Sequence, residues 1–144
     1  MTLETRSILP DPAGAAAKPD EVTILVCSSC RRETDPPDGP DAPRPGTRLA
    51  ADARAAAEGT GVTVRHVACL GNCKRGLTAA VFRSGCWAYV FGGLDEGSGA
   101  DLVAGARLFA TATDGFMPFR ARPEALKRGL VARVPHPDIL KDLP

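Results

Sequence analysis

The pattern of apolar and polar positions in the first half of the chain predicts two strands joined by a helix. Residues 22–26 (VTILV) form a β-branched apolar run, which is typical of a strand buried on both faces. Residues 48–58 are rich in alanine, follow Thr47 as a cap and stop before Gly59, and this predicts a helix. Residues 62–67 (VTVRHV) alternate and are again β-branched. We therefore expect a β–α–β unit with two parallel strands.

The second half of the chain predicts a hairpin and two further helices. Two strand-like runs, 78–82 and 87–91, are separated by a tight link that favours a β-hairpin. Ser98 and the acidic residue three positions later form a capping box for a helix that runs to about Thr113. A proline and a glycine bracket a short third helix over 123–129, and an extended tail follows it.

These elements predict an α/β fold with a thioredoxin-like mixed sheet of about four strands, two main helices and a short C-terminal helix. A chain of 144 residues has the length of one domain. Residues 1–20 contain three prolines and no apolar periodicity, so we expect a flexible segment. The proline-rich stretch 27–46 predicts an irregular surface loop that serves as a lid. The expected organisation is a flexible segment, a domain over 21–137 and a tail over 138–144.

Composition restricts the classes of function. Lys and Arg number 18 against 17 Asp and Glu, a net charge of +1, so no global field attracts nucleic acid or an anionic membrane. The sequence shows neither an export signal nor a long apolar stretch, and we expect a cytoplasmic protein without a membrane partner. Five cysteines, an odd number, then favour metal binding or redox chemistry over a disulfide framework.

Four of the five cysteines form two close pairs, and each pair follows a predicted strand. Two residues separate Cys27 from Cys30 and three separate Cys69 from Cys73, spacings that let each pair fold around a metal centre from one turn. Because neighbouring parallel strands end within about 5 to 10 Å of each other, the two pairs can meet at one end of the sheet. We therefore predict one four-thiolate site, and we exclude Cys86, which begins a later strand.

The residues around these cysteines favour an iron–sulfur cluster, which we predict to be [2Fe-2S]. Gly71 and Gly76 allow the backbone to approach bridging sulfides and to donate N–H···S hydrogen bonds. Lys74 and Arg75 would offset the negative charge of a cluster with four thiolates. No Ser/His/Asp or Cys/His pair and no phosphate-binding glycine loop can be identified, so we expect an electron carrier and not an enzyme.

Other uses of the same four thiolates stay open at this point. Structural Zn²⁺ takes four thiolates at these spacings, and a module that carries zinc or cobalt would use the same soft ligands. Dithiol redox chemistry is a further alternative. The sequence argues against it, because Cys30 leads into a proline-broken loop and not into a helix N-terminus.

The segment Cys69-Leu70-Gly71-Asn72-Cys73 resembles the C-L-G-x-C turn of thioredoxin-like [2Fe-2S] ferredoxins. More closely, the set VCSSCR, VACLGNCKRGLTAAV, WAYVFGGL and RPEALKRGLVARVP is similar to a bacterial family of predicted metal-binding proteins, DUF1636, over roughly residues 22 to 137. This resemblance implies a thioredoxin-like ferredoxin domain, metal binding by the four paired cysteines, and an association with cobalamin and cobalt-handling pathways. The first pair departs from the ferredoxins, which usually place more residues between their first two ligands.

Two further features concern partners. Basic side chains predict a docking face for an acidic redox partner, at Lys74, Arg75, Arg120, Arg122, Lys127, Arg128 and Arg133. Aromatic residues alternate along the last predicted strand and indicate either a core face or a homodimer interface, at Trp87, Tyr89 and Phe91.

Overall fold

The computed structural model describes residues 21–30 and 43–144. The segment 1–20 and the part of the expected lid over 31–42 lie outside these residues, and the division of the chain into segment, domain and tail stays a prediction. The strands of the described part are β2 (Val22–Cys27), β3 (Thr63–Val67), β4 (Ala79–Arg83), β5 (Ala88–Phe91) and β6 (Leu130–Val134). The helices are α2 (Pro45–Ala57), α3 (Gly99–Thr111), α4 (Glu124–Arg128) and α5 (Pro137–Leu140), with a 3-10 turn η2 (Cys73–Arg75).

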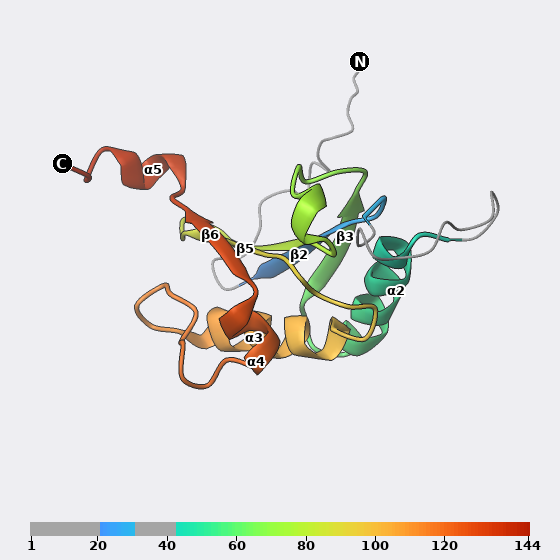
Figure 1. The fold of residues 1–144 in the computed structure, drawn as a ribbon. Helices are drawn as coiled ribbons and strands as arrows, with labels where there is room; N and C mark the ends of the chain where they lie inside the picture. Colours follow the sequence, from blue (N-terminus) through green and yellow to red (C-terminus); the bar gives the residue numbers. More distant parts are fainter. Residues whose placement is uncertain (1–20, 31–42) are drawn as a thin grey trace, which may run out of the picture.

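The strands form one mixed sheet in the order β3-β2-β4-β5-β6 (Figure 1). β2 and β3 are parallel, with Cys27 opposite Val67, as the β–α–β pattern predicts. The remaining neighbours are antiparallel, so β4 begins beside the end of β2, where Ala79 pairs with Val26. The predicted α/β mixed sheet with two main helices is confirmed, and its parallel pair is the part that carries the cysteines.

Helices α2 and α3 pack against each other and against one face of the sheet (Figure 1). Small residues allow this close approach. Gly99, the first residue of α3, has an N–H that donates to Asp52 Oδ2 of α2 at 2.8 Å, and a Cβ at this position would meet Asp52 at 2.5 Å. Large apolar side chains fill the space between the helices and the sheet, among them Ile24, Leu49, Tyr89, Phe91, Leu102 and Phe109. The aromatic alternation along β5 is therefore a core face at Tyr89 and Phe91.

The C-terminal region differs from the expected extended tail. Residues 130–134 pair with β5 as a fifth strand, and a one-turn helix, α5, follows. β6 is an edge strand whose residues are mostly exposed, so it lacks the apolar signal of a buried strand. Its place in the sheet is fixed by tertiary contacts, including Arg133, whose guanidinium lies 5.0 Å from the centre of the Trp87 ring.

The expected helix caps are also different in the structure. α2 begins at Pro45 with Arg44 before it, and the Thr47 hydroxyl donates to the carbonyl of Ser28 at 3.0 Å. The Ser98 hydroxyl donates to Asp95 Oδ1 at 3.2 Å, so the expected capping box is not formed. Both hydroxyls therefore hold neighbouring loops and cap no helix. None of the helices in the described residues is long and apolar enough to span a membrane.

Candidate metal centre

The two cysteine-bearing turns are joined at the C-terminal ends of β2 and β3. The N–H of Ser28 donates to the carbonyl of Val67 at 2.8 Å, and the N–H of Ser29 donates to Ala68 at 3.2 Å. The Ser29 hydroxyl also donates to the Ala68 carbonyl, and the Cys27 thiol lies 3.7 Å from the same oxygen. The parallel ladder thus continues beyond the strands and holds the first cysteine turn against the chain that leads to the second.

The four thiols form an inner pair and an outer pair. Cys27 and Cys30 are 2% and 6% exposed, whereas Cys69 and Cys73 lie on the surface. The inner pair contacts the apolar core below the turn. A group bound between the pairs would therefore have one side in the protein and the other side at the solvent boundary.

The charges of the cysteine thiolates influence the pKa values of their neighbours within and between the two pairs. Burial raises the pKa of the Cys30 thiol, and the hydrogen bond with Cys27 and the charge of the Cys27 thiolate raise it further. The neighbouring Cys69 thiolate raises the pKa of Cys73, and Cys27 of the other pair adds to this effect. Cys73 thus lies within electrostatic reach of both pairs. The two thiolates of a pair repel each other, and a bound cationic centre removes this repulsion.

The thiols are arranged as two pairs and not around a single point. In the segments that the structure describes, no three His, Cys, Asp or Glu side chains are gathered closely enough to hold one metal ion. Four cysteine thiolates in two pairs are a donor set that fits a [2Fe-2S] cluster, and the same donor set fits structural zinc.

A glycine of α2 supports the first cysteine turn. The N–H of Gly46 donates to the Cys30 carbonyl at 2.9 Å, and a Cβ at Gly46 would lie 2.1 Å from the Cys27 carbonyl oxygen. Contrary to our expectation from the proline-broken loop, the turn does lie at the N-terminus of a helix. The helix N–H is bonded to the Cys30 carbonyl, however, and the pKa of the Cys30 thiol is raised. A raised pKa disfavours the thiolate form that an activated cysteine nucleophile requires.

Two other glycines shape the second turn. Gly71 has φ +77° and its N–H donates to Cys69 Sγ at 3.2 Å, which is the N–H···S bond that the sequence predicts. For Gly76 the described residues show no equivalent bond. Gly92 follows β5, and a Cβ there would lie 2.6 Å from Asn72 Nδ2 and 2.7 Å from the Arg75 carbonyl oxygen. The loop after β5 can lie against the second turn only because residue 92 has no side chain.

Thr78 lies between the two turns. It is fully buried, and its carbonyl accepts the N–H of Cys27 at 3.0 Å. Its hydroxyl oxygen is 3.9 Å from Cys30 Sγ and accepts the side-chain amide of Asn72 at 3.1 Å. Thr78, Gly46 and Gly92 are not among the site residues that the sequence predicts. The only signals in the sequence were a threonine that precedes an apolar strand and glycines beside Pro45 and Phe91.

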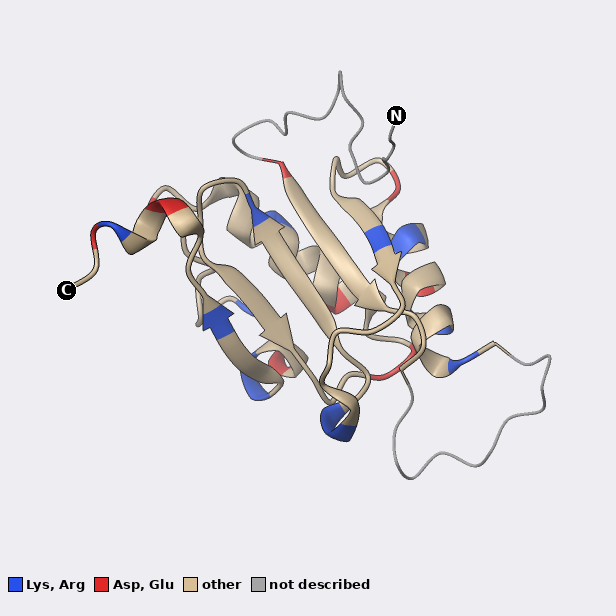
Figure 2. Cartoon of the chain, turned by 90° about the horizontal axis from the view of Figure 1, so that it is seen from above, with Lys and Arg blue, Asp and Glu red and all other residues tan. Residues whose placement is uncertain are grey.

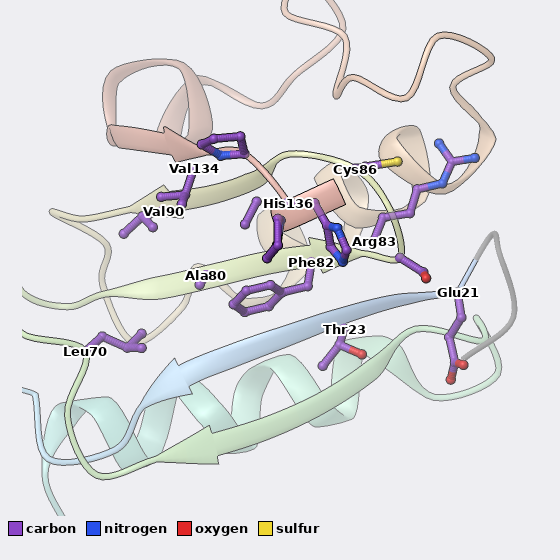
Figure 3. A pocket seen from close by; sticks show the side chains of 14 residues that line it. Glu21, Thr23, Leu70, Ala80, Phe82, Arg83, Cys86, Val90, Val134 and His136 are labelled. Carbon is purple, nitrogen blue, oxygen red and sulfur yellow. The ribbon is translucent and has the colours of Figure 1, made fainter. Parts of the chain in front are cut away.

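Cys86 lies at the other end of the sheet from the paired cysteines. β4 runs antiparallel to β2, so Arg83, at the end of β4, pairs with Val22, five residues before Cys27. Cys86 follows in the hairpin turn and lines an apolar groove of about 550 Å³ on the uncovered sheet face. Figure 3 shows Leu70 of the second cysteine turn at one end of this groove and Cys86 at the other.

Comparisons with known proteins agree with this geometry at the level of the fold. The model of the family DUF1636, described as a protein of unknown function, matches residues 24–136. The crystal structure of the wild-type thioredoxin-like [2Fe-2S] ferredoxin from Aquifex aeolicus has a TM-score of 0.50 at 13% identity, covering 78% of this chain and 97% of that one. A second structure of a thioredoxin-like [2Fe-2S] ferredoxin from the same organism has a TM-score of 0.49 at 14% identity, covering 81% and 96%. No curated protein matches the sequence.

Proposed function

This chain belongs to the DUF1636 family, and on that premise we propose that it is an electron-transfer protein with a [2Fe-2S] cluster on Cys27, Cys30, Cys69 and Cys73. The observation that carries the proposal is that backbone hydrogen bonds join the first cysteine turn to the chain that leads to the second, where two adjacent parallel strands end. When bound, such a cluster supplies reversible one-electron transfer. The thioredoxin-like ferredoxin fold supports the assignment but does not identify the metal.

The chain's own groups are suited to hold such a centre. The inner pair lies in the apolar core, which excludes water from one side of the site. The Gly71 N–H already donates to the Cys69 sulfur, and hydrogen bonds of this kind stabilise metal-bound thiolates. The exposed outer pair brings the centre to the surface, where electrons can pass to a partner.

A second candidate function uses the same thiolates for metal delivery. The exposure of Cys69 and Cys73 favours it, because a surface pair can pass a metal ion to another protein by ligand exchange. This module would carry zinc or cobalt, and the resemblance to the DUF1636 family is what brings cobalt into consideration.

Purification under anaerobic conditions, followed by cluster reconstitution, distinguishes the two functions. The expected product is red-brown, contains about two irons and two sulfides per chain, and bleaches on reduction with dithionite. Four thiolate ligands should give a low midpoint potential, nearer to about −400 mV than to the Rieske range. A colourless protein with one zinc ion per chain after reconstitution would falsify the proposal, since Zn²⁺ has no visible transitions.

We further propose that the basic residues beside the centre form the docking face for an acidic redox partner. Arg122, which the sequence analysis included in this face, is buried and donates to the Met117 carbonyl, so it is not part of it. Lys74 and Arg75 belong to the exposed turn η2. The N–H of Gly92 donates to the Gly129 carbonyl at 2.7 Å, while Gly92 also lies against the Arg75 carbonyl. This contact places the junction of α4 and β6 beside η2, and Figure 2 shows Lys and Arg on all three elements. Their charges can steer an acidic protein toward the exposed cysteine pair.

Reversal of charge at η2 tests this face. The double variant Lys74→Glu/Arg75→Glu should slow electron transfer to a small acidic flavoprotein by about tenfold at low salt, because steering acts on the association rate. The difference should shrink near about 0.5 M salt, where the Debye length is only a few ångströms. Stopped-flow spectroscopy measures both rates.

The matched control is Arg107→Glu/Lys141→Glu, which makes the same charge change at exposed positions on α3 and after α5. This control should keep a rate close to that of the wild type. Equal slowing by the two double variants would show that net charge, and not the face around η2, controls the encounter.

A further inference from the structure

We propose that Thr78 is a positioning residue that donates a hydrogen bond to the Cys30 sulfur, that Asn72 sets the direction of this bond, and that the pair raises the reduction potential of the centre. The inference rests on the proposed function, because it concerns one of the four proposed ligands. It adds two residues that supply no ligand atom.

The position of Thr78 is fixed by backbone contacts. Its carbonyl accepts the Cys27 N–H at 3.0 Å, and the next residue, Ala79, pairs with Val26 in the sheet. Its side chain is fully buried, so no solvent competes for the hydroxyl. A buried hydroxyl needs partners, and among the described residues these are Cys30 Sγ at 3.9 Å and Asn72 Nδ2 at 3.1 Å.

The direction of the bond follows from the chemistry of these partners. In the metal-free protein the Cys30 thiol carries a hydrogen and can donate to the Thr78 oxygen. A metal-bound Cys30 has lost this hydrogen, and its sulfur can only accept. The Asn72 side-chain nitrogen can only donate, so it occupies the oxygen of Thr78 and leaves the hydroxyl hydrogen for the sulfur.

The hydrogen bond from Thr78 offsets the effect of burial on Cys30, which is to disfavour negative charge on its sulfur. The hydroxyl oxygen of Thr78 lies 3.9 Å from the buried Cys30 Sγ, so a hydroxyl hydrogen that points to the sulfur stabilises negative charge on it. Reduction adds negative charge to a centre and its thiolate ligands. A donor to a buried ligand sulfur therefore favours the reduced form and raises the potential.

The outer cysteine pair differs from Cys30 in its access to solvent. Cys69 and Cys73 are exposed, and water can solvate their sulfurs. Cys30 is buried, and among the described residues its side-chain hydrogen-bond partners are Cys27 and Thr78. The potential should therefore depend more strongly on Thr78 than on any single donor to the exposed pair.

The experiment compares Thr78→Val with Thr78→Ser and with the control Thr23→Val, which removes a threonine hydroxyl near the far end of β2. In the reconstituted proteins, Thr78→Val should disfavour reduction about tenfold, which equals about 59 mV for a one-electron couple. Thr78→Ser keeps the hydroxyl and should return the potential to the wild-type value, and Thr23→Val should not change it. Iron content should be the same in all four proteins.

A wild-type potential in Thr78→Val would overturn the proposal, as would a Thr78→Ser variant that shifts as far as Thr78→Val. If Thr78→Val does not fold, Asn72→Ala provides the test, because residue 72 is half-buried and directly precedes the exposed turn η2. Loss of the Asn72 donor frees the Thr78 hydroxyl to turn, and the potential should fall by a smaller amount. An unchanged potential in Asn72→Ala would then reject the pair.

Failure of the proposed function gives a different result. If the wild type takes up zinc and no iron, its lack of colour shows this before any variant is measured. The role of Thr78 is then read from transfer of zinc to a chromogenic chelator, which should be several times faster in Thr78→Val than in wild type and Thr23→Val. Equal transfer rates would reject the hydrogen bond independently of the metal.

Discussion

Replacement of any one of Cys27, Cys30, Cys69 and Cys73 by alanine should reduce the iron and sulfide content of the reconstituted protein by about tenfold or more. Each substitution removes a thiolate, and the fifth cysteine, Cys86, lies at the other end of the sheet and cannot replace it. The chain should still fold, because Cys27 and Cys30 are two small members of a core that consists mainly of larger apolar side chains from the strands and the two packed helices. Iron and sulfide analysis, with circular dichroism as the test of folding, measures both results.

Cys86→Ala is the matched control, since it removes a thiol at the end of the sheet opposite to the paired cysteines. It should keep full iron content and colour, because the cysteine pairs lie five or more residues away along β2 and β4. At about 3.3 Å per residue this separation is about 16 Å, which is too far for a shared ligand. If Cys30→Ala stays fully loaded while Cys86→Ala loses its cluster, the proposed ligand set is wrong.

Gly46→Ala should lower the free energy of unfolding by about 1–3 kcal/mol, the usual cost of overpacking. In an ordinary helix the same change stabilises by about 0.5–1 kcal/mol, so the expected sign is reversed. The reason is the distance of 2.1 Å between the new Cβ and the carbonyl oxygen of Cys27, which forces α2 and the first cysteine turn apart. The variant should also lose iron, since Cys27 and Cys30 move with this turn. Urea denaturation and iron analysis measure the two effects.

Gly97→Ala serves as the control for the loss of a glycine. A Cβ at Gly97 would come no closer than 3.5 Å to another atom, at Asp95 Oδ1, so stability and iron content should stay near the wild-type values. A Gly46→Ala protein with unchanged stability and full iron would show that the turn does not need the close approach of α2.

The sequence alone determined the elements whose signal is local. The run 22–26 is β-branched and apolar enough to predict a buried strand, and the alanine-rich segment before Gly59 predicts a helix. A strand, a helix and a second strand in this order predict the parallel pair, which the structure contains. Once that pair is accepted, the placement of Cys27 and Cys69 after its two strands follows, because the ends of parallel strands meet. The α/β class and the candidate cysteines could therefore be obtained without coordinates.

Only the tertiary structure decided the features that depend on residues far apart in the chain. β6 has an exposed edge-strand sequence and is recognised by its pairing with β5. The Thr47 hydroxyl is a good cap by its chemistry, yet the neighbouring cysteine turn offers it the carbonyl of Ser28. Gly46 and Gly92 are essential for close approach only because another backbone lies against each of them. Thr78 is 48 residues from Cys30, and their contact exists because β4 runs back beside the end of β2. Such contacts arise from sheet order and packing, for which no short stretch of sequence carries a signal.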